Sequence, residues 1–156
     1  MHIKPNSLKL YKKNCENPSA AVVAQANKTG DGTQNSSAAA PFGRVWAIDN
    51  TLRDGPEYTS NVIGNAQGLY VSSSQDATKV TLTMYVDFGF TSGEFSGSSI
   101  NVLSRNPVTE PTRELAVVGG RGKFRMARGF AEIKAHSLDA TTGDGIIEYN
   151  VTVLHY

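Results

Sequence analysis

Lys79-Val-Thr-Leu-Thr-Met-Tyr-Val-Asp-Phe-Gly-Phe90 is the stretch that decides the fold class. Apolar side chains occupy every second position from Val80 to Phe90, and mostly polar residues fill the positions between them. A period of two places alternate side chains on opposite faces of an extended chain, whereas a helix repeats about every 3.6 residues. The stretch therefore predicts a β-strand with one buried face.

Segments on both sides of this stretch also predict strands. They are 8–11, 20–26, 42–49, 62–74, 98–103, 115–118, 123–136 and 147–153. Short polar or glycine-rich turns separate them, and no segment has sustained helical periodicity, which indicates an antiparallel all-β meander. The residues alone leave a sandwich and a closed barrel open, although closure has the advantage of removing exposed strand edges. About eight strands would enclose room for one small ligand.

A glycine cluster, Gly119, Gly120 and Gly122, interrupts the apolar run that begins at Leu115. Glycine adopts positive φ at no steric cost, so the cluster predicts a tight reversal, with the next strand starting at Lys123. A phosphate-binding loop is the competing interpretation. The glycine spacing is not that of a P-loop and the segment that follows is strand-like, so the turn is favoured.

The bulk composition predicts one soluble domain over 1–156, with a flexible start at 1–7 and a mobile loop at 27–40. A net charge of +1 gives no electrostatic reason to expect a nucleic-acid or anionic-membrane partner, and no apolar run is long enough to span a bilayer. Cys15 is the single cysteine and the three histidines are scattered. We therefore expect neither an intramolecular disulfide nor a metal site.

Three tripeptides match the pattern for N-glycosylation, at Asn27, Asn35 and Asn150. The pattern occurs by chance as well, so these residues are only candidates. Met1 to Pro5 lacks the apolar core of a signal peptide, and a secretion signal would have to lie upstream of it.

Several motifs in order and at similar spacing make the sequence resemble the plant dirigent proteins. The motifs are Ala66-Gln-Gly-Leu-Tyr-Val-Ser72, Ser104-Arg-Asn-Pro107, Glu114-Leu-Ala-Val-Val-Gly-Gly-Arg-Gly-Lys-Phe-Arg-Met-Ala-Arg-Gly129 and Glu148-Tyr-Asn-Val-Thr-Val-Leu-His-Tyr156. The resemblance runs from about Leu8 to Tyr156. It implies an eight-stranded antiparallel up-and-down β-barrel, as in the calycin and allene oxide cyclase group, that is usually a homotrimer secreted to the apoplast.

The resemblance also implies a function. Dirigent proteins have no redox cofactor, and a laccase- or peroxidase-type oxidase supplies phenoxy radicals from monolignols or related phenols. The barrel then directs stereoselective coupling in lignan, phenylpropanoid or defence metabolism. A branch of the family instead dehydrates isoflavanols to pterocarpans and is a true lyase. A third reading is a non-catalytic ligand- or glycan-binding protein of plant defence.

Five residues are candidates for the pocket by this resemblance. Arg113 matches a pocket arginine, Tyr70 a pocket tyrosine and Asp49 an aspartate after an apolar strand. Relatives that form pinoresinol carry acids where this chain has Asn106 and, near the end of its first strand, Asn14. An amide forms hydrogen bonds but does not donate a proton at a useful pKa. Both acid positions are thus neutral here, and the sequence does not select a replacement among Glu110, Glu114 and Asp49.

Overall fold

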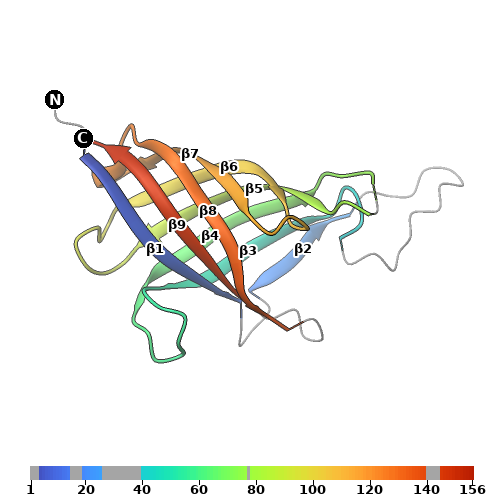
Figure 1. The fold of residues 1–156 in the computed structure, drawn as a ribbon, viewed down its shortest axis with the longest axis horizontal. Coiled ribbons are helices and arrows are strands. Elements are labelled where there is room, and N and C mark those ends of the chain that lie inside the picture. Colours follow the sequence, from blue (N-terminus) through green and yellow to red (C-terminus); the bar gives the residue numbers. More distant parts are fainter. Residues whose placement is uncertain (1–3, 15–18, 26–39, 77, 140–144) are drawn as a thin grey trace, which may run out of the picture.

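The computed structural model describes residues 4–14, 19–25, 40–76, 78–139 and 145–156. They form nine strands and one 3-10 helix (Figure 1). The strands are β1 (Lys4–Asn14), β2 (Ala20–Ala24), β3 (Val45–Arg53), β4 (Val62–Ser72), β5 (Thr81–Phe90), β6 (Ser99–Pro107), β7 (Arg113–Arg121), β8 (Arg128–Leu138) and β9 (Gly145–His155). The helix, η1 (Gly122–Phe124), is far too short to cross a membrane.

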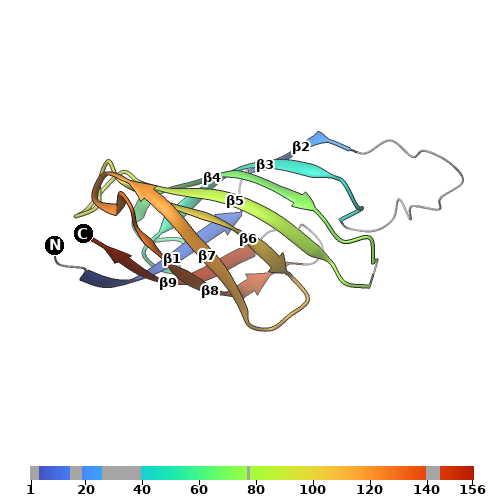
Figure 2. The ribbon, with the colours of Figure 1, turned by 90° about the horizontal axis from the view of Figure 1, so that it is seen from above.

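The strands form one closed antiparallel sheet (Figures 1 and 2). From β3 to β9 each strand pairs with the next along the chain, and β1 lies between β9 and β3. This arrangement confirms the predicted eight-stranded up-and-down barrel. β2 is an additional strand that pairs only with β3, along the part of the β3 edge that β1 does not reach.

Closure of the barrel depends on a short contact. β1 pairs with β9 along its whole length, from Lys4 opposite His155 to Asn14 opposite Gly145. Its pairing with β3 covers only Tyr11 to Lys13 opposite Arg53 to Thr51. Residues 4–7, which we expected in a flexible start, therefore belong to β1, while the expected mobile loop at 27–40 lies outside the described residues except for Ala40.

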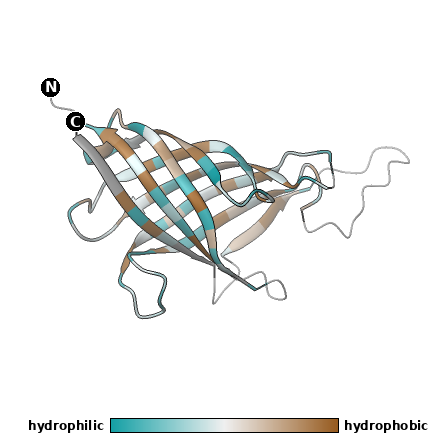
Figure 3. Ribbon diagram, viewed as in Figure 1, coloured by the Kyte–Doolittle hydropathy of each residue, from teal (hydrophilic) through white to brown (hydrophobic). Residues whose placement is uncertain are grey.

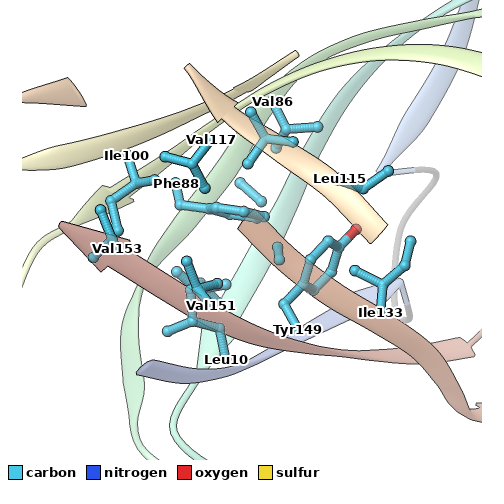
Figure 4. Packing of buried hydrophobic residues seen from close by; sticks show 14 of the residues in the cluster. Leu10, Val86, Phe88, Ile100, Leu115, Val117, Ile133, Tyr149, Val151 and Val153 are labelled. Atoms are coloured by element: carbon cyan, nitrogen blue, oxygen red, sulfur yellow. The ribbon is translucent and has the colours of Figure 1, made fainter. Parts of the chain in front are cut away.

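Strand alternation fills the barrel with apolar side chains, and the ribbon alternates between apolar and polar residues accordingly (Figure 3). Phe88 and Tyr149 meet edge to face in this core, with ring centroids 5.0 Å apart (Figure 4). A second aromatic group closes one end of the barrel, and it consists of Phe90, Phe95, Phe124 and His155. The core is therefore packed from the middle of the barrel to this end.

The glycines of the cluster differ in role, and the reversal begins later in the chain than the sequence predicts. Gly119 and Gly120 belong to β7, and the reversal consists of η1 and the residues up to Ala127, with φ of 62° at Gly122. A Cβ on Gly120 would lie 2.3 Å from the carbonyl oxygen of Ser99 on β6. The expected strand start at Lys123 is thus wrong, since β8 begins at Arg128. Glycine at 120 indicates close packing of β7 on β6 and not a turn, so β7 continues through it.

We predict that Gly120→Ala lowers the free energy of unfolding by about 2–3 kcal/mol, because the new methyl group would meet backbone that cannot move aside. Gly119→Ala is the matched control, since a Cβ there has no neighbour within 4 Å. It should change stability by less than about 1 kcal/mol. Urea unfolding of the two variants measures the difference, and equal stability would show that β6 and β7 do not approach as closely as described.

Candidate functional site

The barrel interior becomes accessible at the end opposite the aromatic cluster. On β5 the inward-facing side chains change from fully buried Phe88 and Val86 to half-buried Leu82. At the same end of β3, β4 and β9 the inward-facing residues Trp46, Tyr70 and Ile147 are also partly exposed, and Ala135 on β8 is exposed. We call this end, defined by these five residues, the open end.

Arg113 points into the barrel just below the open end. It is the first residue of β7 and is 9% exposed. Its Nη1 donates a hydrogen bond of 3.3 Å to Oδ1 of Asn106, and its Nε has no partner. Burial lowers the pKa of the guanidinium, yet an arginine remains charged. Among the described residues no carboxylate forms an ion pair with it, so the interior holds a cation without a counterion.

Asn106 connects Arg113 to the neighbouring strands. It lies on β6 and is buried, and its Nδ2 donates to Sδ of Met84 on β5 at 2.9 Å. Both ends of the amide are therefore engaged, and the contacts cross three adjacent strands. Because the amide is neutral, it fixes the position of the guanidinium but does not compensate its charge.

Tyr70 lies next to this chain of contacts. It faces Met84 across the β4–β5 pair, and its ring stacks on Trp46 at a centroid distance of 4.9 Å. Burial raises the pKa of the Tyr70 hydroxyl. The structure thus brings together three of the five predicted pocket residues, namely Tyr70, Asn106 and Arg113.

Tyr149 completes the interior group and was not singled out from the sequence. Arg113 on β7 pairs with Ile133 on β8, and Ile133 pairs with Tyr149 on β9. Tyr149 is therefore two strands from Arg113, at the same level and on the same inner face. Burial raises the pKa of Tyr149 to about 12, and the charge of Arg113 opposes that shift. In the sequence, Tyr149 occupies one of the alternating positions of 147–153 that are expected to be buried. A hydroxyl at such a position is the one feature that could have pointed to it.

Asp49 does not join this group. It alternates with Ile48 and Asn50, which face inward, so its carboxylate lies on the outer face. There it accepts hydrogen bonds from Gln67 at 2.9 Å and Asn65 at 3.3 Å. Asp49 is therefore not part of the interior site, and an outward position follows from the period of two in β3.

The other candidate residues also lie away from the interior. Glu110 and Glu114 are exposed. Asn150 faces outward on β9 and donates to Oε2 of Glu132 at 3.4 Å. Asn14 ends β1 by its backbone, but its side chain is outside the described residues, as are Asn27 and Asn35 altogether. Neither a carboxylate on the inner face nor a metal-binding cluster occurs in the described part of the chain.

A separate hollow of about 220 Å³ lies on the outer face, between the loop after β6 and strands β8 and β9. Glu148 is 6% exposed there, with its Oε1 3.2 Å from Nζ of Lys9 and 3.4 Å from Nζ of Lys134. Burial alone would raise the pKa of Glu148, but the two lysines outweigh it and hold the pKa below its usual value. This ion cluster braces β1, β8 and β9 from outside and is not connected to Arg113 by any described contact.

The interior group offers a guest two kinds of contact, one electrostatic and one apolar. A guanidinium in a shielded site stabilises an oxygen that carries negative charge, and the stacked Trp46 and Tyr70 offer a flat apolar surface. The family model described as Dirigent-like protein matches residues 6–154. The chain belongs to the dirigent family.

Other dirigent proteins are similar along most of their length. Dirigent protein 15 of Arabidopsis thaliana is 50% identical over 143 residues, which are 90% of this chain and 73% of that protein. Pterocarpan synthase 1 of Glycyrrhiza echinata is 46% identical over 140 residues, 89% of this chain and 70% of that one. A solved structure of a pterocarpan synthase dirigent protein superposes with a TM-score of 0.84 at 40% identity, covering 100% of this dirigent chain and 87% of the other.

We predict that this dirigent protein loses stability in alkali through Tyr149. An unfolded tyrosine titrates at its ordinary pKa of 10.0, whereas folded Tyr149 keeps its proton up to about 12. The unfolded state therefore gains stability as pH rises between the two values. Between pH 9 and 11 the free energy of unfolding should fall about 1.4 kcal/mol further in wild type than in Tyr149→Phe.

Urea unfolding at the two pH values tests this, with Tyr85→Phe on the outer face as control. The control should lose as much stability as wild type. Equal losses in all three proteins would show that Tyr149 is not protected from ionisation in the fold.

Proposed function

We propose that this dirigent protein directs the stereoselective coupling of phenoxy radicals that a separate laccase- or peroxidase-type oxidase generates from monolignols or related phenols. The observation that carries the proposal is the buried Arg113 without a counterion, held by Asn106 near the stacked pair of Trp46 and Tyr70. The group offers one electrostatic contact and one flat surface, which together would fix a single orientation of a phenolic guest.

Orientation is sufficient for this reaction. Two radicals combine with almost no intrinsic barrier, so the protein must only hold the guest with one face exposed. A difference of about 1.4 kcal/mol between the two faces already gives a tenfold preference for one enantiomer. One hydrogen bond to a charged group is worth roughly that much.

Arg113 also fits the step after coupling. The coupled product is a quinone methide, whose carbonyl oxygen gains negative charge as a nucleophile adds to the conjugated carbon. A guanidinium beside that oxygen stabilises the developing charge without transferring a proton. This role agrees with the absence of inward-facing carboxylates among the described residues.

To test this proposal, phenols including coniferyl alcohol are oxidised with a laccase, with and without the protein, and the products are separated by chiral chromatography. We predict an enantiomeric excess with wild type for at least one phenol and racemic product with Arg113→Met. Folding should be retained or improved in this variant, because the substitution removes a buried charge that lacks a counterion.

Arg105→Met is the matched control, because Arg105 lies on the same strand as Asn106 but is exposed on the outer face. It should leave the enantiomeric excess unchanged. Racemic product from every phenol with wild type would contradict the directing role. Unchanged selectivity in Arg113→Met would remove Arg113 from the site.

A dehydratase that forms pterocarpans is the second candidate, favoured by the relatives named pterocarpan synthase at 46% and 47% identity. In that case Arg113 would stabilise the phenolic oxygen of a closed-shell intermediate as water leaves. The same assay separates the candidates when the oxidase is omitted. Turnover of an isoflavanol without oxidant favours the dehydratase, and saturable binding with no change in product favours a ligand-binding defence protein.

We propose further that the protein acts as a secreted homotrimer in the apoplast. Support for self-association comes from an apolar row across the outer face of β4, β5 and β6. It consists of Leu69, Tyr85 and Leu103, which are paired across the strands and 44%, 39% and 50% exposed. Adjacent apolar side chains on an outer surface are suited to burial between subunits.

We predict that Leu103→Glu converts the trimer to a monomer, because a carboxylate in an apolar interface lacks a partner. Light scattering coupled to gel filtration measures the mass. Thr109→Glu, in the exposed loop after β6, serves as control and should remain trimeric. A monomeric wild type, or a Leu103→Glu variant of unchanged mass, would exclude this interface.

A further inference from the structure

A second buried polar group faces the barrel interior at Asn50. It lies on β3 between the inward-facing Ile48 and Leu52 and is only 1% exposed. Its Oδ1 accepts a hydrogen bond of 2.9 Å from Oγ of Ser19, and its Nδ2 has no hydrogen-bond partner. Exchanging the two amide atoms would give the nitrogen a partner and leave the oxygen without one. The amide therefore presents an unpaired polar atom in either assignment.

Asn50 and Arg113 lie on opposite walls. In the closed sheet β3 and β7 are four strands apart through β4, β5 and β6, and also four apart through β8, β9 and β1. Both side chains face inward, and Nε of Arg113 is unpaired as well. An eight-stranded barrel is just wide enough inside for one small ligand. The two unpaired groups are thus placed to contact opposite ends of the same guest.

Leaving a buried polar atom unpaired costs about 1–3 kcal/mol, so a bound oxygen atom would relieve a real penalty at each position. On the β4 side, the wall beside Asn50 offers no polar partner to a trapped water. Its cross-strand neighbour is Ala66, the next residue across is Phe88, and both are apolar. A buried water usually needs two to four polar partners, which these residues do not supply.

We propose that Asn50 is the second polar contact of the guest and makes the site select flat phenols that carry an oxygen at each end. This inference rests on the proposed function, because it takes Arg113 as the contact for the phenolic oxygen. Asn50 would then bind the oxygen at the far end of the conjugated skeleton. A phenol that lacks this oxygen fills the same space but leaves Asn50 unpaired, so it binds more weakly.

Coniferyl alcohol and isoeugenol are the probes for this experiment. Both are methoxyphenols with a conjugated three-carbon chain, and only coniferyl alcohol has a hydroxyl at the far end of that chain. Calorimetric titration without oxidant gives the dissociation constant of each. We expect wild type to bind coniferyl alcohol about fivefold to tenfold more tightly, and Asn50→Leu to bind the two phenols equally.

Asn65→Leu is the matched control, because Asn65 lies one strand away but forms its hydrogen bond with Asp49 on the outer face. It should keep the wild-type preference. Asn50→Ala is a second variant that removes the amide without adding bulk. Its affinities should agree with those of Asn50→Leu.

The outcomes separate this inference from the proposed function. If wild type binds neither phenol, the interior does not receive a phenolic guest and the proposed function fails together with this inference. If wild type binds both phenols and the Asn50 variants keep the preference for coniferyl alcohol, only the role of Asn50 is overturned. Loss of the preference in both Asn50 variants, with isoeugenol affinity unchanged, supports it.

Discussion

Closure of the sheet between β1 and β3 is the constraint on which the rest of the structure depends. Only three residue pairs join these strands, from Tyr11 opposite Arg53 to Lys13 opposite Thr51. Without them the strands would form an open sheet with two free edges, and its inner face would be exposed to solvent. Closure turns one face of the eight strands β1 and β3 to β9 into an interior and gives the side chains on that face a common, shielded space.

That shielded space explains why Arg113 matters. On an open sheet its charge would be hydrated, and a nearby asparagine would have little effect on it. Inside the barrel the guanidinium loses water and its neighbours are Asn106 and Tyr149. Fold stability gains nothing from this arrangement, since a buried cation without a counterion is costly. Buried polar groups without partners tend to occur at functional sites, where a ligand can compensate their cost. Asn50 on the opposite wall also has a buried polar atom without a partner.

The neutral side chain of Asn106 leaves the positive charge of Arg113 uncompensated. The sequence resemblance implies an aspartate at this position in relatives that form pinoresinol. An aspartate 3.3 Å from the guanidinium would form an ion pair and cancel most of the positive potential. The amide keeps Arg113 in place and leaves its charge available. The described interior therefore presents a guanidinium whose charge no carboxylate compensates.

Local sequence patterns were enough to predict most of the strands, the inward-facing positions and the family. The alternation from Val80 to Phe90 is a local property, since it depends only on the period of an extended chain. Tyr70 and Asn106 lie within motifs of the family and Arg113 directly precedes one, so all three could be selected from the sequence. The tertiary structure alone decided which residues meet, because cross-strand register joins residues far apart in the chain. It placed Tyr149 beside Arg113 and Asn50 opposite, excluded Asp49, and showed that Gly120 serves close strand packing and not a turn.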